Sequence, residues 1–243
     1  MLVLENPLKN YYPEIDIATT PDGETVAMVH CNNCTSDINA WANLFKDFAD
    51  TMGVSLNMGD IFTALFKKSL EADDDLGNIL SYNYFSGEHI TGFHSGRPLL
   101  FREPDSNFNL ANFMRVQLFT CFGALRTGLD ILKKENVAID KILGHGGFFK
   151  TPLVGQNVLS AVMDTPVSVM ETAGEGGAWG IAVLASYMIN KGEKSLAEFL
   201  EDDVFASQKM VTSTADEKLK TSFNNFMVRY TKGLKVERAA VEL

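Results

Sequence analysis

Apolar residues recur at two different spacings along the chain, and each spacing predicts one kind of secondary structure. Short runs with strand-like composition lie at residues 2–4, 14–17 and 25–31. Pro21, Asp22 and Gly23 favour a turn between the last two runs, which predicts a β-hairpin there. Over residues 41–52 the apolar spacing becomes helical, and Gly53 is a natural helix stop.

The middle of the chain alternates between helical and irregular stretches. Residues 57–70 and 110–132 carry apolar positions at helical spacing, and the second run is the strongest helix signal in the sequence. The acidic run 71–75, followed by Gly77, is typical of a solvated loop. Residues 81–107 are rich in glycine, aromatic and turn residues without a period. Such a stretch inside a compact chain is typical of functional surface.

The second half of the chain alternates strands with helices. Strands are predicted at residues 138–143 and 166–170, and helices at residues 151–163, 178–190, 195–204 and 216–230. The short connections between the first four of these elements predict helices packed on a mostly parallel sheet. No repeat or linker interrupts the pattern, so we expect one domain over residues 1–243.

The charge balance and the apolar runs exclude two classes of partner. The net charge is -10 and the isoelectric point about 4.9, whereas a nucleic-acid binder needs a positive field. No apolar run approaches the roughly 18 residues that a membrane span needs. The first residues also lack a basic leader followed by an apolar stretch. We therefore expect a cytoplasmic chain with no nucleic-acid and no membrane partner.

Two of the three cysteines form the motif Cys31-Asn32-Asn33-Cys34. One interpretation is a redox pair, which the preceding strand and the polar turn favour. Another is a zinc site, but Cys121 and the four histidines show no matching ligand spacing. A third is that the thiols pack as small apolar residues, and we favour this one.

The glycine-rich turn after residues 138–143 has chemistry that suits an anion. The turn and its flank are Gly144, His145, Gly146, Gly147, Phe148, Phe149, Lys150, Thr151 and Pro152. Glycines let a ligand approach the backbone, and a helix start presents free N–H groups. Thr151 is well placed as the helix N-cap, with Pro152 in the first turn. The motif matches neither a Walker A loop nor GxGxxG, and a structural strand-to-helix turn fits it equally well.

A second glycine-rich turn follows the next strand, at residues 173–177. Consecutive parallel strands end at the same edge of a sheet, so we expect both turns to lie where open α/β folds bind ligands. The alternative is that the small residues allow close helix packing, which we favour for Gly180.

The order of these motifs resembles one family. A Cys and a Trp-led helix (residues 29–45) precede a Gly-Glu loop (83–89), a long helix (113–126), and the two glycine-rich turns with their helices (142–186). In this order, over about residues 25–190, the chain resembles the C-terminal domain of the FGGY carbohydrate kinases, and the first motif resembles pentulose kinases. Shared order is more specific than any single motif.

The resemblance implies a fold, cofactors and a site. The fold is the α/β, actin-like ATPase (ribonuclease H-like) class, with a central mixed sheet flanked by helices. The cofactors are ATP and Mg²⁺, and the phosphate acceptor is a ketopentose such as xylulose or ribulose. Residues 144–151 would hold adenosine and the α-phosphate, and Gln156 with residues 174–177 would line the adenine pocket. The implied nucleotide-binding residues are Gly144, His145, Gly146, Gly147, Lys150, Thr151, Gln156, Gly174, Gly176 and Gly177.

Three positions depart from the family pattern. Phe119 stands where the helix usually has glutamate, His145 replaces the middle glycine, and Lys150-Thr151 replaces a residue followed by serine. None of them removes the backbone amides, so we still expect nucleotide binding. Phe119 and His145 also favour an alternative, a non-catalytic actin-like module that binds ATP as a regulator or scaffold.

The catalytic elements of the family have no match in residues 1–24. These are the Gly-Asp segment with the catalytic base and the Gly-Thr phosphate loop. We therefore expect no catalytic residue in this chain, a sugar bound mainly by an N-terminal domain encoded upstream of Met1, and no turnover by the chain alone. The apolar helix from Leu110 is a candidate surface for a homodimer.

Overall fold

The computed structural model describes residues 1–170 and 176–243 as a mixed α/β structure. Its strands are β1 (Leu2–Val3), β2 (Asp16–Thr19), β3 (Thr25–Met28), β4 (Ile79–Tyr82), β5 (Leu99–Arg102), β6 (Ile142–Gly144), β7 (Val167–Met170) and β8 (Met210–Ser213). Its helices are α1 (Ser36–Thr51), α2 (Met58–Lys68), α3 (Leu110–Thr120), α4 (Gly123–Lys134), α5 (Val154–Met163), α6 (Gly176–Asn190), α7 (Leu196–Phe199) and α8 (Glu217–Val241).

The first sheet has the order β1-β3-β2, with both pairings antiparallel. The predicted hairpin is therefore confirmed, with Thr19 opposite Thr25 beside the turn. β2 begins two residues later than predicted, because the chain turns over Tyr12–Ile15, where the Ile15 N–H donates to the Tyr12 carbonyl at 3.1 Å. β3 ends at Met28, before the Cys31–Cys34 turn.

β4 and β5 form an antiparallel hairpin in which Ile79 lies opposite Arg102. The prediction of an irregular stretch over residues 81–107 was wrong for these strands. Each strand is a short apolar run that is flanked by glycine-rich and polar sequence. Their pairing joins residues far apart in sequence, so local spacing does not reveal it.

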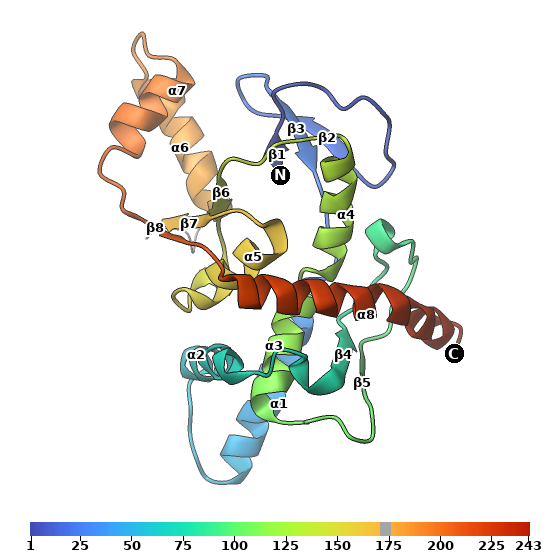
Figure 1. The fold of residues 1–243 in the computed structure, drawn as a ribbon. Coiled ribbons are helices and arrows are strands. Elements are labelled where there is room, and N and C mark those ends of the chain that lie inside the picture. The colour runs from blue at the N-terminus through green and yellow to red at the C-terminus, as the bar shows by residue number, and fades with distance from the viewer. Residues whose placement is uncertain (171–175) are drawn as a thin grey trace.

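α3 is the central helix of the molecule, and Figure 1 shows it behind α8. Residues 111–120 are all buried, and α3 contacts α1, α2, α4, α5 and β4. The single helix predicted over residues 110–132 is in fact two helices, because Phe122 leaves the helical conformation with φ -114° and ψ 5°. Gly123 follows, where a Cβ would lie only 2.4 Å from the Tyr230 ring of α8. Close packing against α8 therefore accompanies the break.

The third sheet has the order β6-β7-β8, with β6 parallel and β8 antiparallel to β7. It is thus mixed, as the family resemblance implies, and not mostly parallel as the short connections predict. The sequence pattern missed β8, which is a short strand with three exposed residues between two helices. Of the two strands predicted at residues 138–143 and 166–170, the second is confirmed one residue shorter, whereas the first begins four residues later than predicted and ends at Gly144.

The remaining predicted helices are confirmed with changed ends. α1 starts at Ser36, five residues before the predicted start, and Gly53 after it has φ +77°. Ser195 and Glu198 form a capping box at α7, and a π-helical turn over Leu200–Val204 continues it. α8 begins after the N-cap Asp216 and extends well beyond the predicted end at Tyr230.

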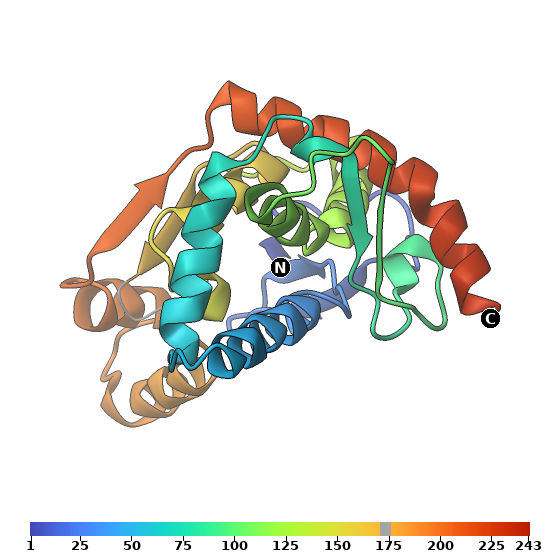
Figure 2. The same ribbon diagram turned by 90° about the horizontal axis from the view of Figure 1, so that it is seen from below.

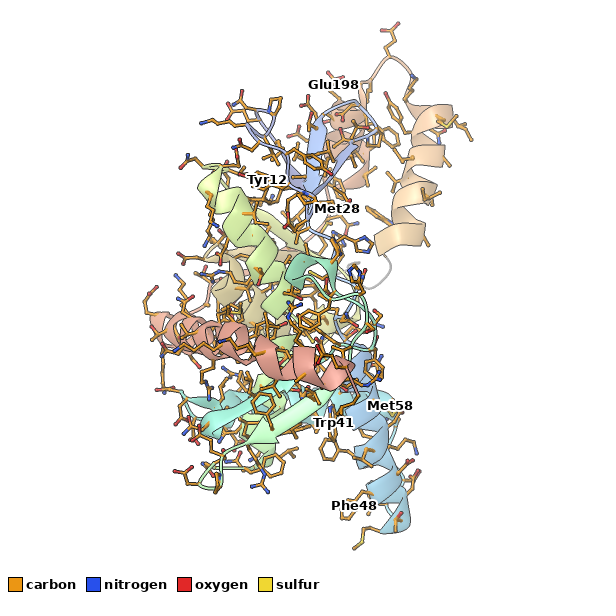
Figure 3. All side chains as sticks on the ribbon, turned by 90° about the vertical axis from the view of Figure 1, so that its right-hand side faces the viewer. Tyr12, Met28, Trp41, Phe48, Met58 and Glu198 are labelled. Carbon is orange, nitrogen blue, oxygen red and sulfur yellow. The ribbon has the colours of Figure 1, made fainter. Side chains whose placement is uncertain are left out.

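α5 is buried almost along its whole length, as α3 is, whereas α1 and α8 lie nearer the outside of the molecule. In Figure 2, α8 follows one edge of the view and α1 the opposite edge. α6 and α7 project from the body beside the first sheet (Figure 1). Phe48 lies near the outer end of α1 (Figure 3), and 66% of its surface is exposed. Within the described residues, no helix is long and apolar enough to cross a membrane.

Candidate functional site

The glycine-rich turn after β6 is anchored in the core by one aromatic ring. The chain forms a 3-10 turn over Gly147–Phe149, and the Phe148 side chain is buried. The Phe148 ring lies edge-on to Phe122, with centroids 5.0 Å apart, and to Phe66 of α2 at 5.6 Å. Aromatic contacts of this geometry are favourable beyond the area they bury. The ring thus holds the backbone on either side of it in place.

The three positions of this turn are occupied by glycine for different physical reasons. Gly144 packs closely against Phe149, because a Cβ at this position would lie only 2.8 Å from the Phe149 ring. Gly146 has φ +99° and ψ 178°, a conformation open essentially to glycine alone. Gly147 has an ordinary φ, and no described atom lies within 4 Å of the position its Cβ would take. Neither its backbone conformation nor its packing against the described residues therefore requires glycine at residue 147.

Gly147 opens onto a cavity of about 490 Å³ between the turn, α1 and α2. This volume lies within the range typical of small-molecule sites. The lining combines apolar rings with hydroxyl, amide and amine groups. The lining residues are Thr35, Ile38, Asn39, Gly59, Phe62, Thr63, Phe66, Gly147, Phe148, Lys150 and Thr151.

The charge around the cavity is unlike that of the whole chain. The net charge of the protein is -10, yet among the described residues that line the cavity Lys150 is the sole charged one. A lone cation inside a partly apolar cavity favours an anionic ligand. The backbone N–H groups of Gly147 and Phe148 add donors, because the 3-10 turn uses only those of Phe149 and Lys150.

Thr151 lies at the cavity but not at a helix start. The helix predicted over residues 151–163 begins at Val154, and its N-cap is Leu153, with φ +66° and no side-chain cap. Thr151 is therefore not the N-cap, and Pro152 is not in the first turn. The reason is tight packing behind the loop, since a Cβ on Gly155 would lie 2.5 Å from the Phe148 carbonyl oxygen.

Gln156 lies behind the loop, 4% exposed, and joins two strands. Its Nε2 donates to the Val211 carbonyl of β8 at 2.8 Å and to the Val167 carbonyl of β7 at 3.3 Å. The side chain is thus committed to the sheet that carries the glycine-rich turn, and it does not line the cavity. Its predicted contact with adenine stays a prediction.

The structure brings three of the ten predicted site residues to the cavity wall, namely Gly147, Lys150 and Thr151. His145 is exposed in the same turn, and Gly177 is exposed in the first turn of α6. Gly176 begins α6, and Gly174 lies outside the described residues. The packing role expected for Gly180 is wrong within the described part of the chain, because no atom there lies within 4 Å of its Cβ position.

Sequence reasoning missed the opposite wall of the cavity, which the start of α1 and one face of α2 supply. The start of α1 is held by Glu88, which is fully buried. Its Oε2 accepts bonds from the backbone N–H groups of Asn32 and Asn33 at 3.0 and 3.2 Å. Asn33 Oδ1 in turn accepts from the Phe85 N–H at 2.9 Å. The Cys31–Cys34 motif and the Gly-Glu loop are thus two parts of one support, which their separation in sequence conceals.

The fold defines the class of the protein. The structure is similar to the ligand-bound xylulose kinase from Lactobacillus acidophilus, with a TM-score of 0.71, 15% identity, and coverage of 96% of this chain and 44% of that one. It is also similar to gluconate kinase from Lactobacillus acidophilus, with a TM-score of 0.67, 13% identity, and coverage of 96% and 44%. These are proteins of the actin-like ATPase fold, and this chain has that fold.

The sequence identifies the family. Residues 1–189 match the model of the FGGY family of carbohydrate kinases, C-terminal domain. The chain therefore belongs to the FGGY family of carbohydrate kinases.

Two further comparisons define the extent of the match. Plasmodium falciparum glycerol kinase with ADP is similar in structure, with a TM-score of 0.58, 15% identity, and coverage of 88% of this chain and 38% of that one. No curated protein matches the chain in sequence. The chain spans less than half the length of the solved kinases described above, covering 44% of the two from Lactobacillus acidophilus.

Proposed function

We propose that this chain is a single domain that forms the nucleotide-binding half of an ATP-dependent sugar kinase, with the cavity beside Gly147 as its nucleotide site. The observation that carries the proposal is the glycine itself. Residue 147 needs no glycine for its φ angle or for its packing among the described residues, so access of a ligand to the cavity is the remaining physical reason. The ADP bound in the glycerol kinase neighbour supports the same ligand class.

The chemistry of the lining fits the parts of a nucleotide. The Phe62 and Phe66 rings and Ile38 offer apolar surface for a base, and Lys150 offers a cation for a phosphate. Gln156 would act indirectly, by holding β7 and β8 in register behind the loop.

Magnesium is expected to arrive with the nucleotide. Among the described residues no group of three or more His, Cys, Asp or Glu side chains could hold a metal ion, and the described cavity lining contains no carboxylate. The described residues therefore do not fit a protein cage for Mg²⁺.

Calorimetric titration with MgADP tests the nucleotide site. The folded chain is expected to bind, and Gly147→Leu is expected to bind at least about tenfold more weakly, a loss of about 1.4 kcal/mol, because its side chain occupies the cavity. Ala182→Leu is the matched control, since it places the same leucine side chain at an exposed position of α6. Absence of heat at millimolar MgADP, or an unchanged affinity of the Gly147 variant, would refute the site.

The proposed acceptor is a ketopentose such as xylulose or ribulose. Its support is the resemblance of the Trp41 region to pentulose kinases and the xylulose kinase among the structural neighbours. We propose that the catalytic base and most sugar contacts lie outside residues 1–243, so that this chain alone does not turn over. An assay of ADP release by the full-length protein with ketopentoses, gluconate and glycerol tests the acceptor. A preference for gluconate or glycerol would refute it.

Phe119 favours a second candidate, a non-catalytic module that binds ATP as a regulator or scaffold, because it replaces the glutamate usual in the family's helix. In that case the full-length protein would bind MgADP and phosphorylate none of these sugars. Turnover with any of them refutes this candidate.

A further inference from the structure

The three cysteines of the chain gather where α1 begins. Cys34 is exposed and directly precedes Thr35, the N-cap of α1. Cys121 is buried at the end of α3, and its Sγ donates a hydrogen bond to the Cys34 carbonyl oxygen at 2.9 Å. Cys31 lies partly buried at the other end of the same turn. Two segments that are 87 residues apart in sequence therefore bring an exposed and a buried thiol into one cluster.

The surroundings make these thiols chemically unequal. The neighbouring Cys121 side chain lowers the pKa of Cys34. The same pairing and complete burial raise the pKa of Cys121 well above its ordinary value. Burial and the neighbouring Glu88 raise the pKa of Cys31 to about 12. Since the thiolate is the nucleophile, Cys34 is the best candidate in the cluster, because it is exposed and its pKa is lowered, whereas those of Cys31 and Cys121 are raised.

The cluster is directly connected to the cavity. The Cys34 carbonyl accepts a second hydrogen bond, from Asn83 Nδ2 at 2.8 Å, so the thiol of Cys121 is one of two donors that hold it. The next residue, Thr35, lines the cavity, as do Ile38 and Asn39 in the first turn of α1. If the sulfur of Cys121 turned from this carbonyl to the sulfur of Cys34, the carbonyl would lose one donor, and Thr35 would shift with it.

We propose that Cys34 is a site of thiol modification, that Cys121 is its resolving thiol, and that the resulting disulfide weakens nucleotide binding in the neighbouring cavity. The oxidant is a low-molecular-weight disulfide. The Cys34 thiolate attacks one of its sulfurs, which forms a mixed disulfide and releases one thiolate. That thiolate takes the proton of Cys121, whose sulfur then attacks Cys34 Sγ and releases the second thiolate, which is protonated by water at neutral pH. The protein dithiol is oxidised, and the small disulfide is reduced to two thiols.

Mass spectrometry after incubation of the folded chain with oxidised glutathione tests the chemistry. The wild type is expected to lose two hydrogens, with peptide mapping linking Cys34 to Cys121. Cys121→Ser is expected to stop at a glutathione adduct on Cys34, and Cys34→Ser to form neither product. Cys31→Ser is the matched control and is expected to behave as the wild type. A Cys31–Cys34 disulfide in the wild type, or no disulfide at all, overturns the assignment.

The effect on the cavity is measured by titrating reduced and oxidised chain with MgADP. Oxidation is expected to weaken binding by about fivefold or more, a typical coupling between sites, and dithiothreitol is expected to restore it. Cys121→Ser without oxidant supplies a folded reference that lacks only the buried thiol. If the oxidised chain binds MgADP as tightly as the reduced chain, the proposed effect of the disulfide on nucleotide binding is overturned.

The effect on binding rests on the proposed nucleotide site. The failure of that site and the failure of the thiol chemistry give different experimental results. A reduced chain that does not bind MgADP refutes the nucleotide site, whereas the mass measurement still decides whether Cys34 and Cys121 react as proposed.

Discussion

The Phe148 ring lies edge-on to the Phe122 ring, with centroids 5.0 Å apart and an angle of 88° between their planes. Phe148 belongs to the loop that borders the cavity, and Phe122 to the break between α3 and α4 in the core. This one contact therefore links the shape of the cavity to the packing of the central helix. It explains why this glycine-rich loop has a defined conformation.

Replacing Phe148 by alanine is expected to lower both stability and nucleotide affinity. Removal of a buried ring should reduce the free energy of unfolding by about 3 kcal/mol, and the loop should lose its anchor against Phe122 and Phe66. Urea unfolding and MgADP titration measure the two effects. Leu143→Ala on β6, where the side chain is 48% exposed, is the control and should change stability by about 0.5 kcal/mol or less. Full affinity in a folded Phe148 variant would contradict the anchoring role.

Phe119 supports α8 in place of the glutamate usual in the family. Its side chain is fully buried, with ring centroids 5.1 Å from Phe223 and 5.6 Å from Phe226. Phe119→Leu should lower the free energy of unfolding by about 1.5 kcal/mol, and Phe119→Glu by about 4 kcal/mol, because an ionised group would be buried among aromatic rings. Chemical denaturation measures both.

The control for this pair is Val228→Glu, which introduces the same charge at a position of α8 that is 55% exposed. Its stability should lie within about 0.5 kcal/mol of the wild type. A Phe119→Glu protein as stable as this control would show that residue 119 tolerates the family's carboxylate.

Lys150 should determine the salt dependence of nucleotide binding. It is exposed and is the sole charge among the described residues of the cavity lining. Lys150→Ala is therefore expected to fold normally, to bind MgADP about tenfold more weakly, and to lose much of the decrease in affinity with ionic strength. Lys141→Ala removes a similar exposed charge outside the cavity and should leave both quantities unchanged. If both variants changed MgADP affinity and its salt dependence equally, the cause would be the net charge of the protein and not the position of Lys150.

Glu237 should make the protein less stable as the pH rises. Its side chain is fully buried in α8, its Oε1 accepts the Arg97 N–H at 2.7 Å, and loss of hydration raises its pKa above the ordinary 4.5. The folded state therefore holds this proton more tightly than the unfolded state. Stability should be greatest below about pH 4.5 for this group and fall as the pH rises through the raised pKa.

The comparison with Glu237→Gln isolates this titration. The difference in unfolding free energy between wild type and variant, measured in urea from about pH 4 to about pH 7, should shift in favour of the variant as the pH rises. A difference that is constant with pH would mean that Glu237 has the same pKa in both states.

The local elements that the sequence predicted best are those whose signal lies within a few residues. The helix at residues 57–70 carries its own N-cap, since the Asn57 side chain accepts the Asp60 N–H. The hairpin at Pro21–Gly23 and strand β7 also depend on neighbouring residues. The ordered motifs identified the family for the same reason, because their order is a property of the chain itself.

The long-range pairings were beyond such reasoning. β4 pairs with β5 across 16 intervening residues, and β8 joins β7 after two helices. The break at Phe122 occurs beside Tyr230, more than 100 residues further along the chain. In each case a partner distant in sequence decides the conformation, so the hydrophobic period alone indicated a longer helix or an irregular stretch.

The sequence by itself determined that this chain has two glycine-rich turns in a family-like order, and that Gly147, Lys150 and Thr151 belong to one of them. Only the tertiary structure decided that these residues face α1 and α2 across a cavity, and that Gln156 lies behind it. It also decided that Cys34 meets Cys121, although the motif pairs it with Cys31. The reason is that composition and spacing specify local conformation, whereas the packing of buried rings and hydrogen-bonded turns specifies which distant segments meet.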